Sequence, residues 1–118
     1  MRNFRSLNIW KDGIVLVKRI YKLTDCLPYE EKYGLKSQMC RAVVSIPSNI
    51  AEGCSRNSET EFKRFLEIAI GSAFELETQL IILSELKFIV KEQLIPILEL
   101  LNNEQRMINS LISKIKSQ

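Results

Sequence analysis

The spacing of apolar residues constrains the fold of this chain more than any other sequence feature. Four segments, at about 7–27, 36–54, 59–86 and 92–116, carry apolar side chains at steps of three and four residues. Such steps gather side chains on one side of an α-helix, whereas a half-buried strand alternates every second residue. The connections are short and no strand pattern competes. The sequence therefore predicts one all-α domain over residues 1–118, folded as an up-down-up-down four-helix bundle.

The chain carries more apolar surface than one small bundle needs. The main stripes of the last three helices are Met39, Val43, Ile46 and Ile50; Phe62, Leu66, Ala69, Ala73, Leu76, Leu80 and Leu83; and Leu94, Leu98, Leu101, Ile108, Ile112 and Ile115. The first helix has two stripes, beginning at Leu7 and Ile9, and second stripes pass through Phe74 and Ile97. If the second stripes stayed exposed to water, their apolar area would exceed the patch that monomeric proteins normally tolerate. We expect a homo-oligomer, or a monomer whose extra stripes cover one another or meet a different protein.

A proline interrupts the second helical segment. Residues 45–53 read S-I-P-S-N-I-A-E-G. Within a helix, Pro47 removes one backbone donor and collides with the carbonyl of Val43, at a cost of roughly 3 kcal/mol. That cost indicates a local task for the segment. Gly53 is expected to end the helix as a left-handed C-cap, and Ser58 is expected to begin the capping box of the next helix.

A polar stripe follows one face of the second helix. It consists of Gln38, Arg41, Ser45, Asn49, Glu52 and Arg56, spaced by three or four residues. Ser45 and Asn49 are poor helix formers, whereas a solvated helix face usually carries Lys, Glu and Gln. Ser72 and Glu75 of the third helix are placed to meet the stripe, with Arg41 and Glu75 as an ion pair. The stripe is a structural network between helices, a groove for a ligand or partner, or a chance pattern.

The charge balance is mildly basic. The chain has 17 Lys+Arg against 14 Asp+Glu, a net charge of +3, which permits an anionic partner without requiring one. The candidate nucleic-acid contacts are the basic residues before and along the first helix: Arg2, Arg5, Lys11, Lys18 and Lys22. This face is either an ordinary solvated surface or a surface that binds an anion.

Several classes of site are excluded by residue type. The chain has no histidine, and its three cysteines, Cys26, Cys40 and Cys54, are 14 residues apart, which fits neither a zinc site nor a histidine-assisted nucleophile. No phosphate-binding or dinucleotide motif is present. We therefore expect a protein that is not an enzyme and has no cofactor or metal. Reduced thiols and the lack of a long apolar run predict a cytoplasmic protein that does not contact the membrane.

One long motif identifies a family resemblance. The run R-A-V-V-S-I-P-S-N-I-A-E-G at 41–53, followed by E-F at 61–62, A-I-G-S at 69–72 and E-L-E at 75–77, strongly resembles the bacterial "four helix bundle protein" family. That family includes proteins encoded in intervening sequences of large-subunit ribosomal RNA genes. The likeness covers about residues 7–86 and extends more weakly beyond them.

The resemblance implies an all-α bundle assembled as a homopentamer. It also implies relatives that serve as accessory proteins of diversity-generating retroelements, where they bind a reverse transcriptase and RNA through a basic exterior. This chain departs from the family pattern at Gly13, where Ala is usual, at Leu27, where Phe is usual, and at Lys87, where Gly is usual. These changes affect packing and one turn, and they leave the expected fold unchanged.

Three functional hypotheses follow. The first is an oligomeric bundle that binds RNA or another nucleic acid through basic surface residues. The second is a protein-interaction scaffold or accessory subunit, for example of a reverse transcriptase, that docks its partner at the polar stripe or a residual apolar face. The third is a small-molecule or metal site at the stripe, near Glu52 or Glu75.

Overall fold

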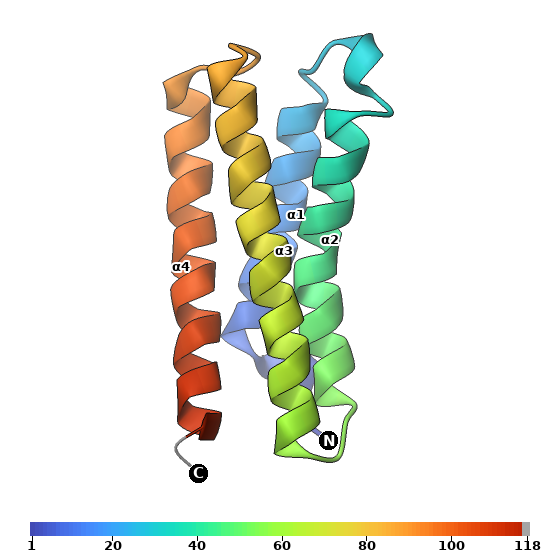
Figure 1. Cartoon of the computed structure of the whole chain (residues 1–118), viewed down its shortest axis with the longest axis vertical. Helices are drawn as coiled ribbons and strands as arrows, with labels where there is room; N and C mark the ends of the chain where they lie inside the picture. The colour runs from blue at the N-terminus through green and yellow to red at the C-terminus, as the bar shows by residue number, and fades with distance from the viewer. Residues whose placement is uncertain (117–118) are drawn as a thin grey trace.

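The structure, a computed structural model, describes residues 1–116, and all the regular secondary structure within them is helical. Four long helices, α1 (Asn8–Thr24), α2 (Leu35–Cys54), α3 (Glu59–Glu85) and α4 (Lys91–Lys116), run up, down, up and down (Figure 1). Two short 3-10 helices, η1 (Phe4–Ser6) and η2 (Tyr29–Glu31), lie before α1 and between α1 and α2. The predicted all-α fold is confirmed, and each predicted helix end lies within three residues of the observed one.

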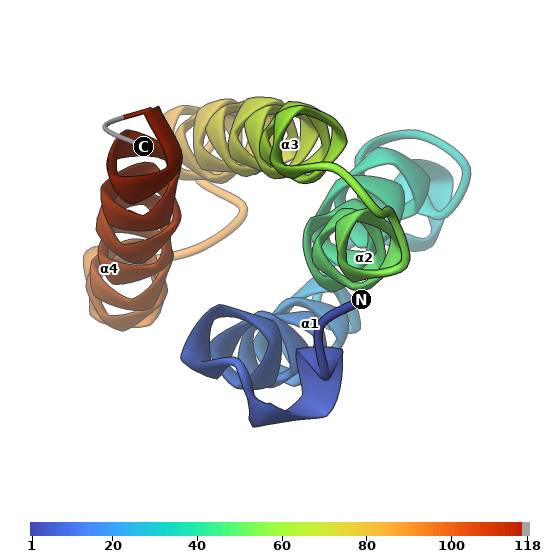
Figure 2. The same ribbon diagram turned by 90° about the horizontal axis from the view of Figure 1, so that it is seen from below.

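The four helices surround one core. Viewed along the bundle, α1 lies beside α2 and α4, and α3 lies diagonally across from α1 (Figure 2). The α2–α3 seam is packed most closely, while α1 and α4 meet most loosely. The first and last helices thus form the weakest of the four seams.

The core follows the predicted stripes closely in α2 and α3. The fully buried side chains there are Met39, Val43, Ile46, Ile50, Phe62, Leu66, Ala69, Ala73, Leu76, Leu80 and Leu83. Burying each large member of this set contributes about 1.5–3 kcal/mol. The prediction for α4 is partly wrong: Ile97 is buried although it was assigned to the second stripe, whereas Leu94 and Leu98 are half-buried. The start of α4 is rotated toward α1 relative to the predicted stripe.

The turn between α2 and α3 confirms one prediction and corrects another. The hydroxyl of Ser58 accepts a hydrogen bond from the Glu61 amide at 3.1 Å and so caps α3 as expected. Gly53, however, is not a left-handed cap, because α2 continues to Cys54 and no described glycine has a positive φ. A Cβ on Gly53 would lie 2.8 Å from Cβ of Phe65. The glycine is needed for the close approach of α3, and it does not end the helix.

Pro47 is buried inside α2, and the helix continues through it without a break. Its ring packs against Gly13 of α1: a Cβ on Gly13 would lie 3.1 Å from Cβ of Pro47 and 3.3 Å from its Cδ. The proline and the glycine therefore bring α1 and α2 together at the middle of the bundle. At Gly13 the chain departs from the pattern of the family that it resembles, and this contact explains why a smaller residue fits there.

Candidate functional site

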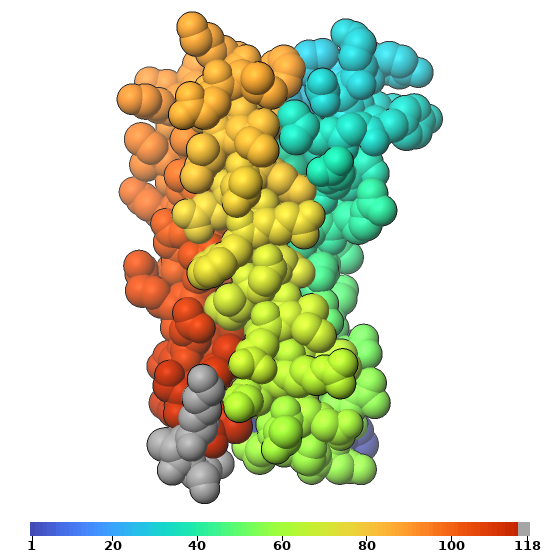
Figure 3. Space-filling view, viewed as in Figure 1, coloured from blue at the N-terminus to red at the C-terminus, as the bar shows by residue number. Residues whose placement is uncertain are grey.

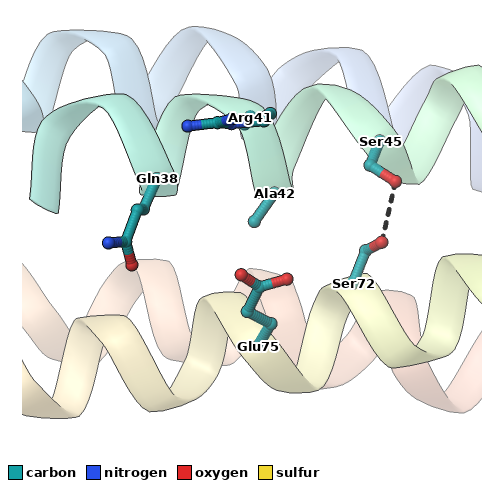
Figure 4. A pocket seen from close by; sticks show the side chains of 6 residues that line it. All are labelled: Gln38, Arg41, Ala42, Ser45, Ser72 and Glu75. Carbon is teal, nitrogen blue, oxygen red and sulfur yellow. Dashed lines mark hydrogen bonds between the residues drawn. The ribbon is translucent and has the colours of Figure 1, made fainter. Parts of the chain in front are cut away.

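The polar stripe of α2 lies against α3 and borders a hollow of about 450 Å³. Its lining residues are Gln38, Arg41, Ala42 and Ser45 from α2 with Ser72 and Glu75 from α3 (Figure 4). We call this hollow the α2–α3 groove. Five of the eight predicted stripe residues therefore meet at one place.

One end of the groove is closed by a hydrogen-bond network. The hydroxyls of Ser45 and Ser72 are 2.8 Å apart, which is a hydrogen bond between the two helices (Figure 4). The side-chain amide of Asn49 donates to both the carbonyl and the hydroxyl of Ser45 at 2.8 Å. Since these polar groups satisfy one another, this part of the stripe is structural. Short side chains at Ser45, Asn49 and Ser72 are what allow the two helices to approach here.

The other end of the groove is open, and its charged groups do not pair across it. Arg41 donates through Nη2 to the Ser37 hydroxyl at 3.3 Å, one turn back on α2. Glu75 accepts from the side-chain amide of Gln79 at 3.3 Å, one turn along α3. The predicted Arg41–Glu75 ion pair is absent from the described salt bridges, because each group is held by its own helix. The groove thus presents a guanidinium and a carboxylate on opposite walls. This pattern suits a ligand or partner that carries one negative and one positive group.

Glu52 and Arg56 lie outside the groove. Arg56 donates to the Glu52 carboxylate at 3.3 Å across one helical turn, and its guanidinium lies 5.0 Å from the centre of the Phe65 ring. The pair is solvent-exposed, so its contribution to stability is about 0.3–0.5 kcal/mol. Arg56 therefore lies over Phe65 near the start of α3.

The basic candidates fall into two groups. Lys11, Lys18 and Lys22 are exposed on α1, and their positions lie within about 40° around the helix and span about 16 Å along it. No ion pair within residues 1–116 engages these three lysines, which we call the α1 lysine ridge.

The two arginines that precede α1, Arg2 and Arg5, make contacts that the three lysines do not. Arg2 pairs with Glu59 at 2.7 Å and lies 4.0 Å from the centre of the Phe62 ring, while its amide donates to the Cys54 carbonyl. The hydrogen bond that Arg2 donates to the Glu59 carboxylate raises the pKa of Arg2 above its ordinary value. Arg2 therefore ties the N-terminal segment to the α2–α3 turn. Arg5 lies 5.9 Å from the ring centre of Phe4 and remains exposed.

Neither a metal-binding cluster nor a membrane-spanning helix is found among residues 1–116. Among residues 1–116, no cluster of three or more His, Cys, Asp or Glu side chains has an arrangement that would hold a metal ion. In the same span, every helix is too short or too polar to cross a membrane.

Comparison with known proteins decides the family. A family model described as 23S rRNA-intervening sequence protein matches residues 5–110, which is most of the chain. The chain belongs to this family. The resemblance inferred from the sequence motif is thereby confirmed.

A solved structure supports the fold of this 23S rRNA-intervening sequence family member. The crystal structure of a protein of unknown function from the S23 ribosomal protein family of Bacteroides thetaiotaomicron VPI-5482 is 27% identical to it, with a TM-score of 0.83. The match covers 89% of this chain and 95% of that chain. No curated protein matches the chain.

Sequence reasoning missed a buried acid in this family member. Glu104 of α4 is completely buried, and neither of its carboxylate oxygens has a hydrogen-bond partner among residues 1–116. Desolvation, with a smaller effect from the negative charge of Asp12, raises its pKa from 4.5 to about 8. The spacing held a signal: Leu101, Glu104 and Ile108 follow the three-and-four steps of a core stripe. An acid at a core position of such a stripe indicates a buried carboxyl group.

Proposed function

We propose that this protein is a non-enzymatic, cytoplasmic helical bundle that self-associates and binds RNA through the α1 lysine ridge. The observation that carries the proposal is the ridge itself, three exposed lysines on one helix face with no acidic partner among the described residues. Lysine ammonium groups attract phosphates without reading bases, so such a ridge suits contacts along a nucleic-acid backbone. The family description, which refers to 23S rRNA intervening sequences, supports RNA as the partner.

Self-association is part of the proposal because α3 exposes apolar side chains along its outer face. Phe74 and Ile81, seven residues and so about 20° apart on the same side of α3, are 55% and 44% exposed. Figure 3 shows α3 running the height of one face of the molecule, where a second copy would have access. Covering this face would remove the apolar surface from water, and repeating the protomer would multiply its net charge of +3 to about +15 in a pentamer.

The RNA proposal is tested by removing the ridge charges. The triple variant Lys11→Gln/Lys18→Gln/Lys22→Gln is compared with wild type for binding a structured 23S rRNA fragment over a range of salt concentrations. Each lost phosphate contact should reduce the slope of log K against log salt by about 0.7–0.9. We expect weaker binding and a slope reduced by about 2 to 3 per ridge engaged.

A matched control removes the same charge elsewhere. Arg64, Lys87 and Lys91 are exposed and lie on α3, on the α3–α4 turn and at the start of α4. Their triple change to Gln lowers the net charge equally, so general attraction falls equally in both variants. Equal losses in the two variants, or wild-type binding that is insensitive to salt, would refute ridge-specific RNA binding.

The assembly is tested by native mass. Analytical ultracentrifugation should show a species heavier than the 13.7 kDa protomer, at about 69 kDa for a homopentamer. Phe74→Lys should shift this species toward the protomer, because it places a charge within the exposed apolar face. A wild-type protein that sediments as a protomer at working concentration would remove self-association from the proposal.

A second candidate function is a protein-interaction scaffold or accessory subunit, for example of a reverse transcriptase, with the partner docked in the α2–α3 groove. The unpaired Arg41 and Glu75 on opposite walls favour it, because a partner side-chain pair of opposite polarity would neutralise both. The double variant Arg41→Gln/Glu75→Gln should lose a captured protein that the lysine-ridge variant retains. If the ridge variant also loses it, capture depends on RNA and the scaffold hypothesis fails.

A further inference from the structure

Glu104 occupies a core position of α4 but carries an ionisable group. It is 0% exposed, it lies in the same stripe as the buried Leu101 and Ile108, and neither Oε1 nor Oε2 has a hydrogen-bond partner in the part of the chain that the structure describes. An isolated carboxylate buried in an apolar core costs several kcal/mol unless it becomes neutral or gains a partner. Nothing in the RNA-binding proposal uses this group, so its presence requires a separate explanation.

The neighbouring helices make room for the Glu104 carboxyl but supply no donor. Its Oε2 lies 3.4 Å from the point where a Cβ of Gly13 on α1 would stand, and Cβ of Pro47 on α2 lies 3.1 Å from the same point. Proline has no backbone N–H to donate. The adjacent Gln105 is also buried, but its side-chain amide donates to Glu77 of α3 at 2.9 Å.

The charges around Glu104 oppose its ionisation. On α1, the half-buried Asp12 is the charged side chain whose field acts on Glu104, and it has the same sign. The buried positions of α2 and α3 near the centre of the bundle are uncharged, and Glu77 of α3 is held by the amides of Asn102 and Gln105. Desolvation, with the smaller effect of Asp12, raises the pKa of Glu104 to about 8, and no cation among residues 1–116 offsets these two effects.

The seam that Glu104 closes is also the weakest one. α1 and α4 meet more loosely than the other neighbouring helices (Figure 2). Two hollows of about 300 and 410 Å³ lie along this seam, and both are lined by Arg19 of α1 and Pro96 of α4. Pro96 lacks the N–H that would bond one turn back, so the start of α4 is held by fewer hydrogen bonds. If one helix separates from the bundle, these features favour α4 separating from α1.

We propose that Glu104 is a proton-operated switch on the α1–α4 seam: the neutral carboxyl keeps the seam closed, and loss of its proton favours an open seam in which water reaches the carboxylate. The device goes beyond RNA binding and does not depend on it. In the open seam the carboxyl is hydrated and regains its ordinary acidity. The balance between closed and open forms should therefore shift about tenfold toward open for each pH unit, until the closed form itself ionises near pH 8.

The test is amide hydrogen exchange of wild type and Glu104→Gln, compared at equal pH so that intrinsic exchange rates cancel. Glutamine keeps the shape of the side chain and cannot ionise, and the variant keeps all three cysteines, so thiol titration affects both proteins alike. In amides of α1 and α4 that exchange through seam opening, the wild-type-to-variant rate ratio should rise about tenfold per pH unit from about pH 6 to 8 and then level off. In α2 and α3 the ratio should rise less.

A second variant keeps Glu104 in place. Asp12→Asn removes the like charge that helps to raise the pKa of Glu104, so the rise in exchange should level off at a lower pH than in wild type. A rate ratio independent of pH, an equal rise in all four helices, or an unchanged levelling point in Asp12→Asn would each overturn the switch. If Glu104→Gln fails to fold, the comparison of wild type with Asp12→Asn still decides the question.

Discussion

Gly53 provides the sharpest test of how α2 and α3 pack. It is buried in the last turn of α2, and a Cβ added there would lie 2.8 Å from Cβ of Phe65 and 3.2 Å from Cδ1 of Phe62. Carbon atoms in contact normally stand about 3.5–4.0 Å apart. Because Cβ of Phe65 is fixed to the α3 backbone, rotation of the ring cannot relieve the overlap. The variant Gly53→Ala must displace the start of α3.

The expected change in the free energy of unfolding of Gly53→Ala follows from two opposing effects. Alanine in a helix interior is favoured over glycine by about 0.5–1 kcal/mol. Overpacking a closely packed core costs about 1–3 kcal/mol. We therefore expect Gly53→Ala to lower the free energy of unfolding by about 1–2 kcal/mol in spite of the better helix former.

Gly71 is a matched control in the next helix. It is exposed in the middle of α3, and among the described residues a Cβ there would have no atom within 4 Å apart from its chain neighbours and the backbone of its own helix. Only the helix preference acts at this site, so Gly71→Ala should raise the free energy of unfolding by about 0.5–1 kcal/mol. The same substitution should thus have opposite signs at the two glycines.

Urea denaturation followed by far-ultraviolet circular dichroism measures both changes, at one fixed protomer concentration because association contributes to apparent stability. A Gly53→Ala variant as stable as wild type would refute the close-approach argument. A loss of stability in Gly71→Ala, accompanied by a lower native mass, would show that another copy packs at Gly71 and would change the meaning of the control.

Three further predictions concern single side chains. The pKa of Glu104 is about 8 in the folded protein and 4.5 ordinarily, so the stabilisation from its neutral form is complete below about pH 4.5 and is lost as pH rises to 8. Over that range the free energy of unfolding of wild type should fall by about 1.4 kcal/mol per pH unit, up to about 5 kcal/mol in all. The free energy of unfolding of Glu104→Gln should not show this fall. Lys87, with φ at 63° in the α3–α4 turn, is in a region that favours glycine, so Lys87→Gly should raise the melting temperature by about 4 °C, equivalent to about 1 kcal/mol. Ser72→Ala removes the interhelical bond to Ser45 and should cost about 1 kcal/mol in urea melts; an unchanged midpoint would show that the bond contributes nothing.

Much of the candidate site was predictable because it depends on spacing along one helix. Steps of three and four residues placed Gln38, Arg41 and Ser45 on one face of α2, and the structure shows that face bordering the groove. The cross-helix partner Ser72 was also predicted, since α3 must follow α2 in an antiparallel sense. The predicted ion pair of Arg41 with Glu75 was wrong, because such a pair depends on the distance between two helices and on competing partners on each helix.

By itself, the sequence determined the four helices, their antiparallel order and nearly all of the α2 and α3 core, since these follow from a local period and short connections. Only the tertiary structure decided why Gly53 must be glycine, where Arg2 is held, and that Glu104 is buried without a partner. The physical reason is that helix formation depends on neighbours a few residues away, whereas steric overlap, ion pairing and desolvation depend on atoms brought together from distant parts of the chain.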